Sequence, residues 1–372
     1  MILIDATSLQ SEHRLRGVGS YLRHLITAIE ASSQEVHYLV SSVDQNHTKN
    51  FLPQERTHVM WRLHKPAQVY WAYNELSLRL ALQLYKPTYF LAPDFNGLVV
   101  NPYGRTTAIL HDLTALKLNE PAPMTNPSAY LSDLRWRVYA RKLRVAKQII
   151  AISSAAKQDA VKMLGLSENK IHVVHHGVDH THYKDSVGKG KFSGEPSYFL
   201  HLGGLNSNKN QTRILEAFAN LARDFQNINL YFAGPWNADN LAWLERQRSE
   251  LNLGERVKHL GYIAYEDLPS LYGNALAFLF PSLEEGFGMP VLEAMASGSP
   301  VITSNCSSLP EVAGDAALLV DPYSTESILL AMKGLLESRE ERTRLRSLGF
   351  QHAARFTWEA TAKQTLEIVG AN

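Results

Sequence analysis

The strongest constraint on the fold is a repeated order of short apolar runs, glycine-containing turns and helical stretches. In the first half, strand-like runs occur at Met1–Asp5, Val36–Ser41, Tyr89–Ala92, Thr107–Leu110, Gln148–Ile152 and Ile171–Val174. Helical stretches such as Tyr73–Leu84 separate these runs. This alternation predicts a parallel sheet with helices on both faces, and in such a sheet ligands bind beyond the carboxyl ends of the strands.

The same alternation begins again in the second half. Its strand-like runs are Tyr198–Leu202, Asn229–Ala233, Val257–Leu260, Ala275–Phe280 and Val301–Thr303. Between the halves, Lys184–Pro196 is rich in glycine and lysine and has the composition of a linker. A chain of 372 residues that is 45% hydrophobic can form two domains with separate cores. We predict an α/β protein with domains at residues 1–185 and 197–355, joined by a linker at 186–196.

Composition excludes several classes of protein. The 37 Lys and Arg balance the 36 Asp and Glu, so no overall positive charge favours nucleic acid. The single cysteine, Cys306, excludes an internal disulfide framework and a cysteine-based zinc site, and it fits a reducing compartment. The first residues lack the basic start of a signal peptide, and no run is long enough to span a membrane. We therefore expect a cytoplasmic protein.

The segment Phe280–Pro300 carries the clearest chemical signal. A strand-like run leads to the turn Glu285-Gly286-Phe287-Gly288-Met289, and Pro290 then opens a segment rich in helix formers. We expect the backbone N–H groups of Gly286 to Met289 to be unpaired at a helix N-terminus, where a phosphate is favoured. The alternative is a surface turn with a capping glutamate.

Two glutamates frame this turn, and because Pro290 lies between Glu285 and Glu293 they cannot share one continuous helical face. They can contact two ends of one ligand. The pattern resembles the donor-site signature of the retaining, GT-B-fold glycosyltransferases of family 4, the glycosyl transferases group 1, and it is most similar to bacterial mannosyltransferase-like members. The resemblance extends over the segments Gly261–Leu268, Asn305–Pro322 and Phe356–Ala362.

The resemblance implies a GT-B fold, in which two doubly wound Rossmann-like parallel-sheet domains face each other across a cleft. It implies that the C-terminal helix, at about residues 356–372, crosses back to the first domain. It also implies that Glu285 contacts hydroxyls of the donor sugar, Glu293 holds the ribose hydroxyls, and the backbone of Tyr262 and Ile263 lies near the base. The implied nucleotide-sugar-binding residues are Gly17, Gly19, Gly203, Gly204, Lys209, Tyr262, Ile263, Glu285, Gly286, Phe287, Gly288, Met289 and Glu293.

Two features of the first half are candidates for the same site. Gly17 and Gly19 open a helix, but the third glycine of a dinucleotide fingerprint is missing, so an ordinary helix-entry loop is the alternative. The resemblance implies that this loop approaches the donor phosphates. His111 directly follows a strand-like run, which predicts that it points into a ligand cleft. In the resembled family, a histidine at this place lies beside the donor sugar.

The turn after Tyr198–Leu202 is also rich in small residues. Gly203 and Gly204 allow close approach to a ligand, and Lys209, at the start of a helix, can place an ammonium on a diphosphate. The resembled family usually has an arginine in this turn, where the present chain has Gly204 and Asn208. Lys209 is therefore expected to be the main cation on the leaving phosphate. The predicted catalytic residues are His111, Lys209 and Glu285.

No metal site or cofactor is expected. The adjacent His175 and His176 diverge and are interpreted as loop residues, and no Asp-x-Asp motif is placed to hold a metal on a diphosphate. Glu311 is interpreted as a charge at a helix N-terminus.

A basic helix is predicted within Asn126–Ala146. Bases are frequent and acids absent in residues 135–147, and Trp136, Tyr139 and Leu143 form an apolar face between them. A solvated helix face is one interpretation. The other is peripheral contact with anionic lipid at the inner face of a membrane.

These features predict a metal-independent, retaining hexosyltransferase. It would move a sugar, with mannose from GDP-mannose as the first guess, to a glycan or lipid-linked acceptor in the synthesis of bacterial surface polysaccharide, such as lipopolysaccharide. Two alternatives remain open: a sugar-nucleotide epimerase of the same fold, and a non-catalytic subunit that binds nucleotide sugar. Acceptor dependence distinguishes the first, and binding without turnover would support the second.

Overall fold

The structure, a computed structural model, describes residues 1–10, 17–43, 48–49, 51–60, 70–94, 97–118 and 137–370. The chain divides into two compact units. Unit 1 consists of Met1–Gly177 and Trp358–Asn372, and unit 2 consists of Val178–Thr357.

Unit 1 is built on a seven-stranded parallel sheet with the order β3-β2-β1-β4-β5-β6-β7. Ile2 of β1 pairs with Val36 on one side and Tyr89 on the other. The strands are β1 (Ile2–Asp5), β2 (Val36–Ser41), β3 (Thr57–Met60), β4 (Tyr89–Ala92), β5 (Arg105–Leu110), β6 (Gln148–Ala151) and β7 (Ile171–Val173).

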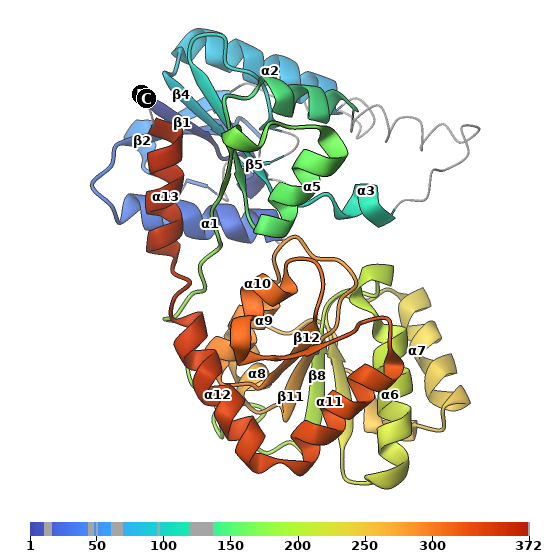
Figure 1. Ribbon diagram of the computed structural model, residues 1–372. Coiled ribbons are helices and arrows are strands. Elements are labelled where there is room, and N and C mark those ends of the chain that lie inside the picture. Colours follow the sequence, from blue (N-terminus) through green and yellow to red (C-terminus); the bar gives the residue numbers. More distant parts are fainter. Residues whose placement is uncertain are drawn as a thin grey trace, which may run out of the picture. The chain divides into compact units, whose positions relative to one another are not determined.

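Helices cover both faces of this sheet (Figure 1). Helix α13, from the C-terminal end of the chain, packs along α1 and contacts the strands β4, β5 and β6. The other face packs against α2, α5 and an unlabelled helix at 137–145. The labelled helices are α1 (Gly17–Glu30), α2 (Tyr70–Tyr85), α3 (Thr114–Leu118), α5 (Ser154–Leu164) and α13 (Trp358–Gly370).

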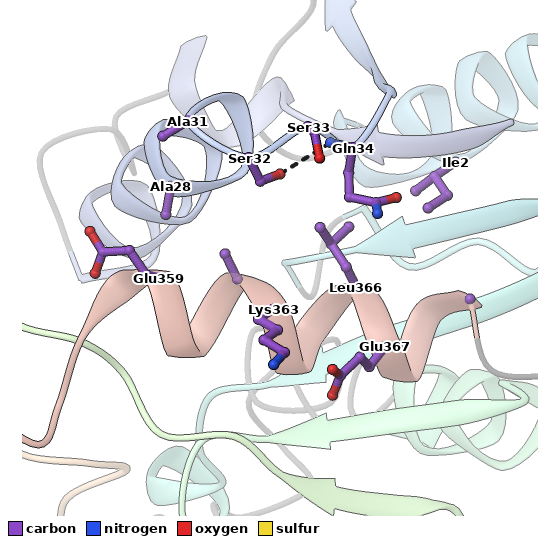
Figure 2. Close-up of a pocket in the computed structure, with 12 residues that line it drawn as sticks. Ile2, Ala28, Ala31, Ser32, Ser33, Gln34, Glu359, Lys363, Leu366 and Glu367 are labelled. Carbon is purple, nitrogen blue, oxygen red and sulfur yellow. Dashed lines mark hydrogen bonds between the residues drawn. The ribbon is translucent and has the colours of Figure 1, made fainter.

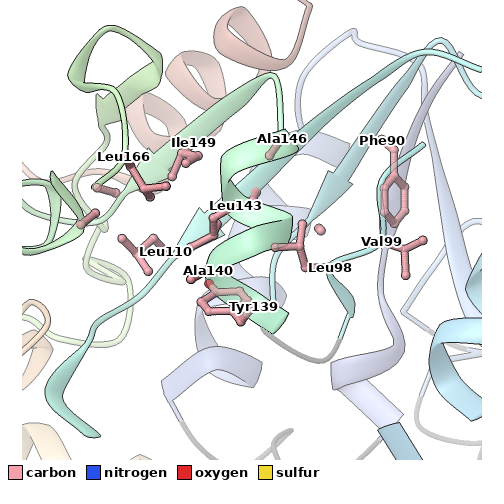
Figure 3. Close-up of a cluster of buried hydrophobic side chains, with 14 of the residues drawn as sticks. Phe90, Leu98, Val99, Leu110, Tyr139, Ala140, Leu143, Ala146, Ile149 and Leu166 are labelled. Carbon is pink, nitrogen blue, oxygen red and sulfur yellow. The ribbon is translucent and has the colours of Figure 1, made fainter. Parts of the chain in front are cut away.

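The core on this second face explains why the helix at 137–145 holds its position. Leu143 is fully buried, and Figure 3 shows it among Leu110, Ile149 and Leu166. Burial of a leucine side chain stabilises a fold by about 2 kcal/mol. The apolar face of this helix therefore packs inside unit 1.

Unit 2 has a six-stranded parallel sheet with the order β10-β9-β8-β11-β12-β13. Numbered within the unit, this is the order 3-2-1-4-5-6 of a Rossmann-type sheet, whose winding reverses between β8 and β11. The strands are β8 (Tyr198–Leu202), β9 (Asn229–Ala233), β10 (Val257–His259), β11 (Ala277–Phe280), β12 (Val301–Ser304) and β13 (Leu318–Val320).

The helices of unit 2 lie on both faces of its sheet, with α6 packed on α11 and α9 packed on α12 (Figure 1). Helix α6 is strongly amphipathic, and its buried residues include Ile214, Leu215 and Phe218. The helices are α6 (Gln211–Asp224), α7 (Ala238–Glu250), α8 (Leu268–Gly273), α9 (Met289–Ser297), α10 (Leu309–Ala313), α11 (Thr325–Glu337) and α12 (Arg339–Ala353).

The predicted fold class is confirmed by these two sheets. Two strands escaped the sequence analysis, β3 and β13, because each is a short strand at a sheet edge and carries little periodicity. The segment at 186–196 was expected to link the two domains, but the structure shows it packed within unit 2. Its residues Gly188 and Phe192 donate backbone hydrogen bonds to Asn274 Oδ1 (2.8 Å) and Ser270 Oγ (3.0 Å), so the segment is part of unit 2. The boundary between the units lies at Gly177 and Val178 rather than at 186–196.

Candidate functional site

The reversal point of the unit 2 sheet is the natural place for a ligand. Crossover connections leave β8 and β11 toward opposite faces, which opens a crevice beyond their carboxyl ends. The segments that follow these strands are residues 203–210 and 281–288. Both segments were predicted to bind the donor.

Close backbone packing shapes the first of these segments. Gly203 and Gly234 have φ angles of +155° and +135°, in the region that favours glycine. A Cβ atom on Gly234 would lie only 2.7 Å from the carbonyl oxygen of Gly203, and Trp236 Nε1 donates a hydrogen bond of 2.9 Å to the same oxygen. Because Gly203 and Gly234 have no side chains, the backbone segments directly after β8 and β9 can lie in contact.

A buried polar pair holds the carbonyl of Gly204. Gln211 Nε2 donates to Gly204 O at 2.8 Å and lies 3.3 Å from His201 Nε2. His201 Nδ1 is 2.9 Å from Leu279 O and must donate to it, which makes Nε2 the acceptor for Gln211. Burial lowers the pKa of His201 to about 4, so the ring is neutral. Sequence reasoning missed both residues, although a histidine inside the buried run Tyr198–Leu202 was the available signal.

Two asparagines join the loop after β8 to the loop after β11. Asn208 Nδ2 donates to Glu284 O at 3.1 Å, and Leu283 N donates to Asn208 O at 2.7 Å. Asn210, at a φ of +62°, donates to Pro281 O at 2.9 Å. Asn208 occupies a place where the resembled family usually has arginine, and here its side chain joins two loops.

Lys209 and Glu285 form an ion pair in this joined region. Lys209 Nζ lies 2.6 Å from Glu285 Oε1, and the two side chains are 19% and 13% exposed. Lys209 Nζ also lies 4.8 Å from the centroid of the Phe280 ring, within the range of a cation–π contact. The structure thus brings together two of the predicted catalytic residues, Lys209 and Glu285. The carboxylate of Glu285 balances the positive charge of Lys209.

The glycine-containing turn is fixed by two serines. Ser307 Oγ accepts a hydrogen bond from Glu285 N, and Ser308 Oγ donates to Glu285 O and Phe287 O. The side chain of Phe287 is buried, and both Gly286 and Phe287 have interactions within the protein. The role of the four N–H groups from Gly286 to Met289 in binding an anion stays a prediction. The part of the turn suited to an anion is the first turn of α9, at Gly288 and Met289, where N–H groups have no intrahelical partner.

Glu293 lies one helical turn after Met289 and so on the same face of α9. Its Oε2 accepts a hydrogen bond of 3.0 Å from the Tyr272 hydroxyl. Burial raises the pKa of Glu293 to about 7, against the opposing effect of hydrogen bonds from Tyr272 and Tyr183. A carboxylate held in this way is suited to accept hydrogen bonds from ligand hydroxyls.

The residues after β10 complete this end of the unit 2 sheet. Gly261, at a φ of +73°, accepts a backbone hydrogen bond of 2.9 Å from Gly234. The Tyr262 side chain is 77% exposed, and Ile263 is half-buried. Tyr262 therefore presents a ring to solvent beside the glycine contacts.

In unit 1, His111 directly follows β5, as the sequence indicated. Its Nε2 lies 2.8 Å from Pro93 O and donates to it, so Nδ1 is the acceptor nitrogen. Burial lowers the pKa of His111, while the Pro93 carbonyl and the charges of Asp94 and Asp112 oppose this effect. His111 is therefore a neutral imidazole at neutral pH.

Rings from three other segments surround His111. Tyr21 meets its edge at 5.1 Å, His176 lies at 6.2 Å, and Trp358 packs on both Tyr21 and His176. His176 lies in the loop after β7, as predicted, and its side chain, 5% exposed, belongs to this aromatic cluster. Sequence reasoning missed the cluster because its members are far apart along the chain.

The two other glycines of the prediction are placed at the start of α1. The helix begins at Gly17, which is exposed, and Gly19 is buried. Residues 11–16, which precede the helix, lie outside the described part.

A groove of about 580 Å³ also lies in unit 1, between α13 and the end of α1 (Figure 2). Glu359, Lys363 and Glu367 follow one another along α13 at this groove. None of the predicted site residues lines it.

The apolar side of the predicted basic helix does not face solvent. Tyr139 and Leu143 are buried in the core of unit 1, so they cannot form an apolar surface. Lys142 Nζ pairs with Glu75 at 2.8 Å, and Arg144 donates to Leu164 O. The first two residues of the predicted basic stretch, Arg135 and Trp136, lie outside the described residues.

In the part of the chain that the structure describes, no helix is long and apolar enough to cross a membrane. Within the same residues, no group of three or more His, Cys, Asp or Glu side chains is arranged to hold a metal ion.

Comparison with known proteins identifies both halves of the chain. Residues 15–182 match the model "Glycosyltransferase Family 4", and residues 184–352 match "Glycosyl transferases group 1". O-antigen chain mannosyltransferase B of Escherichia coli is 37% identical over 175 residues, which are 45% of this chain and 44% of that protein. The serotype-specific mannosyltransferase WbdA of Escherichia coli is 27% identical over 276 residues, or 71% of this chain and 33% of WbdA. The chain thus spans less than half the length of these curated relatives.

Solved structures agree on the fold. Anabaena HepE in complex with UDP and glucose superposes with a TM-score of 0.76 at 18% identity, covering 100% of this chain and 99% of that one. WaaG, a glycosyltransferase involved in lipopolysaccharide biosynthesis, superposes with a TM-score of 0.73 at 16% identity, covering 100% of both chains. The two matched halves, the two sheets and these neighbours show that the chain belongs to the GT-B glycosyltransferases of family 4, the glycosyl transferases group 1.

Proposed function

We propose that this protein is a retaining hexosyltransferase that transfers mannose from GDP-mannose to a hydroxyl of a glycan or lipid-linked acceptor in the synthesis of bacterial surface polysaccharide. The observation that carries the proposal is the grouping of Lys209, Glu285, Glu293 and the start of α9 around the reversal point of the unit 2 sheet. Family membership supports transfer, and the names of the mannosyltransferase relatives support mannose.

The reaction places its greatest electrostatic demand on the leaving group. The bond between the anomeric carbon and the diphosphate oxygen breaks, and a bond from the acceptor oxygen to that carbon forms on the same face. The departing diphosphate takes the acceptor proton. Negative charge therefore develops on the diphosphate, where preorganised positive groups stabilise the transition state.

Two groups of unit 2 can meet that charge. The first turn of α9 offers N–H groups and the positive end of the helix dipole. Lys209 offers an ammonium that is held against Phe280 and Glu285. We assign the diphosphate to these groups, and with them in place the reaction needs no metal ion. Undiminished activity in excess chelator is expected, and activity restored only by a divalent cation would refute metal independence.

The glutamates are assigned to the hydroxyls of the donor. Glu285, beside Lys209, would contact the hexose, and Glu293 would contact the ribose. The exposed ring of Tyr262 and the backbone of Ile263 are assigned to the base. In unit 1, His111 is a neutral imidazole whose Nδ1 can accept a hydrogen bond, and its contribution to transfer is tested by His111→Ala.

The central experiment combines binding and turnover. The purified chain is screened by thermal shift against GDP-mannose, UDP-glucose and related sugars, and then assayed for transfer and hydrolysis with the donor that binds. Glu285→Ala should abolish transfer while nucleotide binding survives, whereas Glu293→Ala should mainly weaken nucleotide binding. Equal and small effects of both changes would refute this division of roles.

The same assays separate the alternatives. Conversion of the sugar nucleotide without any acceptor would indicate an epimerase. Binding without turnover, restored by a second protein, would indicate a non-catalytic subunit. Inverted configuration of the product would refute the retaining mechanism. We propose the cytoplasm for this reaction, because a chain with the single cysteine Cys306 fits a reducing compartment.

A further inference from the structure

Glu293 is held by two buried tyrosines that the proposed mechanism does not use. Tyr272, on α8, donates its hydroxyl to Glu293 Oε2 at 3.0 Å and is fully buried. Tyr183, in the segment that opens unit 2, also forms a side-chain hydrogen bond with Glu293 and is 4% exposed. We call Tyr183, Tyr272 and Glu293 the tyrosine clamp.

The neighbours of the clamp fix Tyr183 in place. Its ring packs edge-on against Tyr265 at 5.9 Å and against Tyr272 at 6.3 Å. Tyr265 is stacked on His182 at 3.7 Å with an interplanar angle of 9°, and its hydroxyl donates to Asp179 Oδ2 at 3.3 Å. Two segments that are far apart in the sequence, at Tyr183 and at Tyr272, therefore converge on one carboxylate.

The clamp restricts what the carboxylate can do. A carboxylate has about four lone-pair positions, and the two phenols occupy part of them from the protein side. The remaining positions can accept two hydrogen bonds from one partner, which is the requirement of a vicinal diol. Because buried phenols and a desolvated carboxylate have fixed orientations, the acceptor geometry is preorganised.

We propose that Tyr183 and Tyr272 are positioning residues that fix the Glu293 carboxylate as the acceptor for the ribose diol of a nucleoside diphosphate. The inference rests on the proposed function, since it assumes that Glu293 contacts the nucleotide. It assigns roles to two residues that the sequence analysis did not single out.

The proposal has a pH signature. Burial raises the pKa of Glu293 to about 7, and both phenol hydrogen bonds oppose that rise. The other titratable groups around the clamp are Tyr265 and Asp179. Burial raises the pKa values of Tyr183, Tyr265 and Tyr272, so all three remain protonated donors at neutral pH. Binding of a diol should strengthen as pH rises through 7, because the ionised carboxylate is the better acceptor. Loss of a phenol should move that midpoint upward.

The test is calorimetric titration of the full-length chain with GDP, and with UDP as a second probe, between pH 6 and pH 9. Each nucleotide is compared with its 2′,3′-dideoxy analogue, which lacks the diol. The variants are Tyr272→Phe, Tyr183→Phe and Glu293→Gln. Tyr231→Phe is the matched control, because Tyr231 is a buried tyrosine of the same unit whose hydroxyl donates to a different glutamate, Glu195, at 2.9 Å.

We expect Tyr272→Phe to weaken binding of the ribonucleotide about tenfold at pH 7, as is typical for loss of a hydrogen bond to a charged group. It should also raise the pH midpoint, while binding of the dideoxy analogue changes little. Glu293→Gln should abolish the pH dependence, and Tyr231→Phe should behave like the wild type. Melting temperatures check that each variant is folded.

Three results would overturn the inference. Equal weakening of the ribonucleotide and the dideoxy analogue, without a shift of the midpoint, would show that the tyrosines act only in folding. Equal affinity of the wild type for both nucleotides would refute the ribose contact while leaving nucleotide binding intact. A wild-type chain that binds neither GDP nor UDP would refute the nucleotide assignment of the proposed function itself.

Discussion

Replacement of Glu293 by glutamine should change how the stability of the protein depends on pH. Burial raises the pKa of this carboxyl from its ordinary 4.5 to about 7. Below pH 4.5 the group is protonated in both the folded and the unfolded chain. As pH rises toward 7, the unfolded chain releases the proton first, so stability is lost progressively until the folded carboxyl also ionises.

The magnitude follows from the two pKa values. A difference of one pKa unit between the folded and the unfolded chain corresponds to about 1.4 kcal/mol, so the full loss of unfolding free energy is about 3 kcal/mol. About 2.5 kcal/mol of this loss falls between pH 5 and pH 8. Glutamine cannot ionise and should not show this loss. The unfolding free energy of Glu293→Gln relative to the wild type should therefore rise by about 2.5 kcal/mol over that range.

The assay is urea unfolding of the full chain at pH 5, 6, 7 and 8, followed by circular dichroism. Taking the difference between variant and wild type cancels the other titrating groups. Glu340→Gln is the matched control, since this glutamate is exposed on α12. If Glu293→Gln and the wild type lose stability in parallel, burial does not control the protonation of Glu293, and the reasoning on the clamp fails with it.

Three further predictions follow from the packing and the surface charge. Gly234→Ala should destabilise the protein by about 2 kcal/mol or more in urea unfolding, because the new Cβ would clash with the carbonyl oxygen of Gly203. The control Gly254→Ala, at a φ of +54° with open space around it, should destabilise the protein by only about 1 kcal/mol. Equal effects of the two substitutions would refute the clash. A chain truncated after Thr357 should lose the buried Trp358 and the packing of α13 on α1, so its melting temperature and its activity should both fall. The control chain truncated after Gly370 should keep its melting temperature and its activity. Full activity of the chain truncated after Thr357 would refute a role for α13. Because the apolar face of the helix at 137–145 is buried, its exposed bases such as Arg141 could contact anionic lipid only through their charge. Sedimentation with anionic liposomes should then fall with added salt and with Arg141→Glu, and salt-independent binding or none would refute this contact.

Local signals in the sequence were enough to place most of the elements. The helix predicted to start near Lys209 is α6 (Gln211–Asp224) in the structure, and it was recognisable because its apolar period is strong along its whole length. The short strand β13 was missed because three residues at a sheet edge carry almost no pattern. The helix at 137–145 was found, but its apolar face was considered as a membrane surface, since a sequence does not say what an apolar face packs against.

In the candidate site too, the sequence shows some features, and only the structure shows others. The turns after β8 and β11 are recognisable because glycine, proline and charged residues follow apolar runs at fixed spacing. That Asn208 joins two loops, and that Lys209 pairs with Glu285, depends on contacts between residues 76 positions apart. No local pattern records such a contact.

The sequence alone determined which segments form strands and helices, and which turns hold glycine and charge at their ends, because these properties depend on neighbouring residues. Only the tertiary structure decided the environment of each charge. Burial desolvates Glu293 and raises its pKa, while the hydroxyls of Tyr183 and Tyr272, which are directed at the carboxylate, oppose that rise. Desolvation and hydrogen bonding depend on what surrounds a group in space, and the chain brings those surroundings together from segments that are far apart in its sequence.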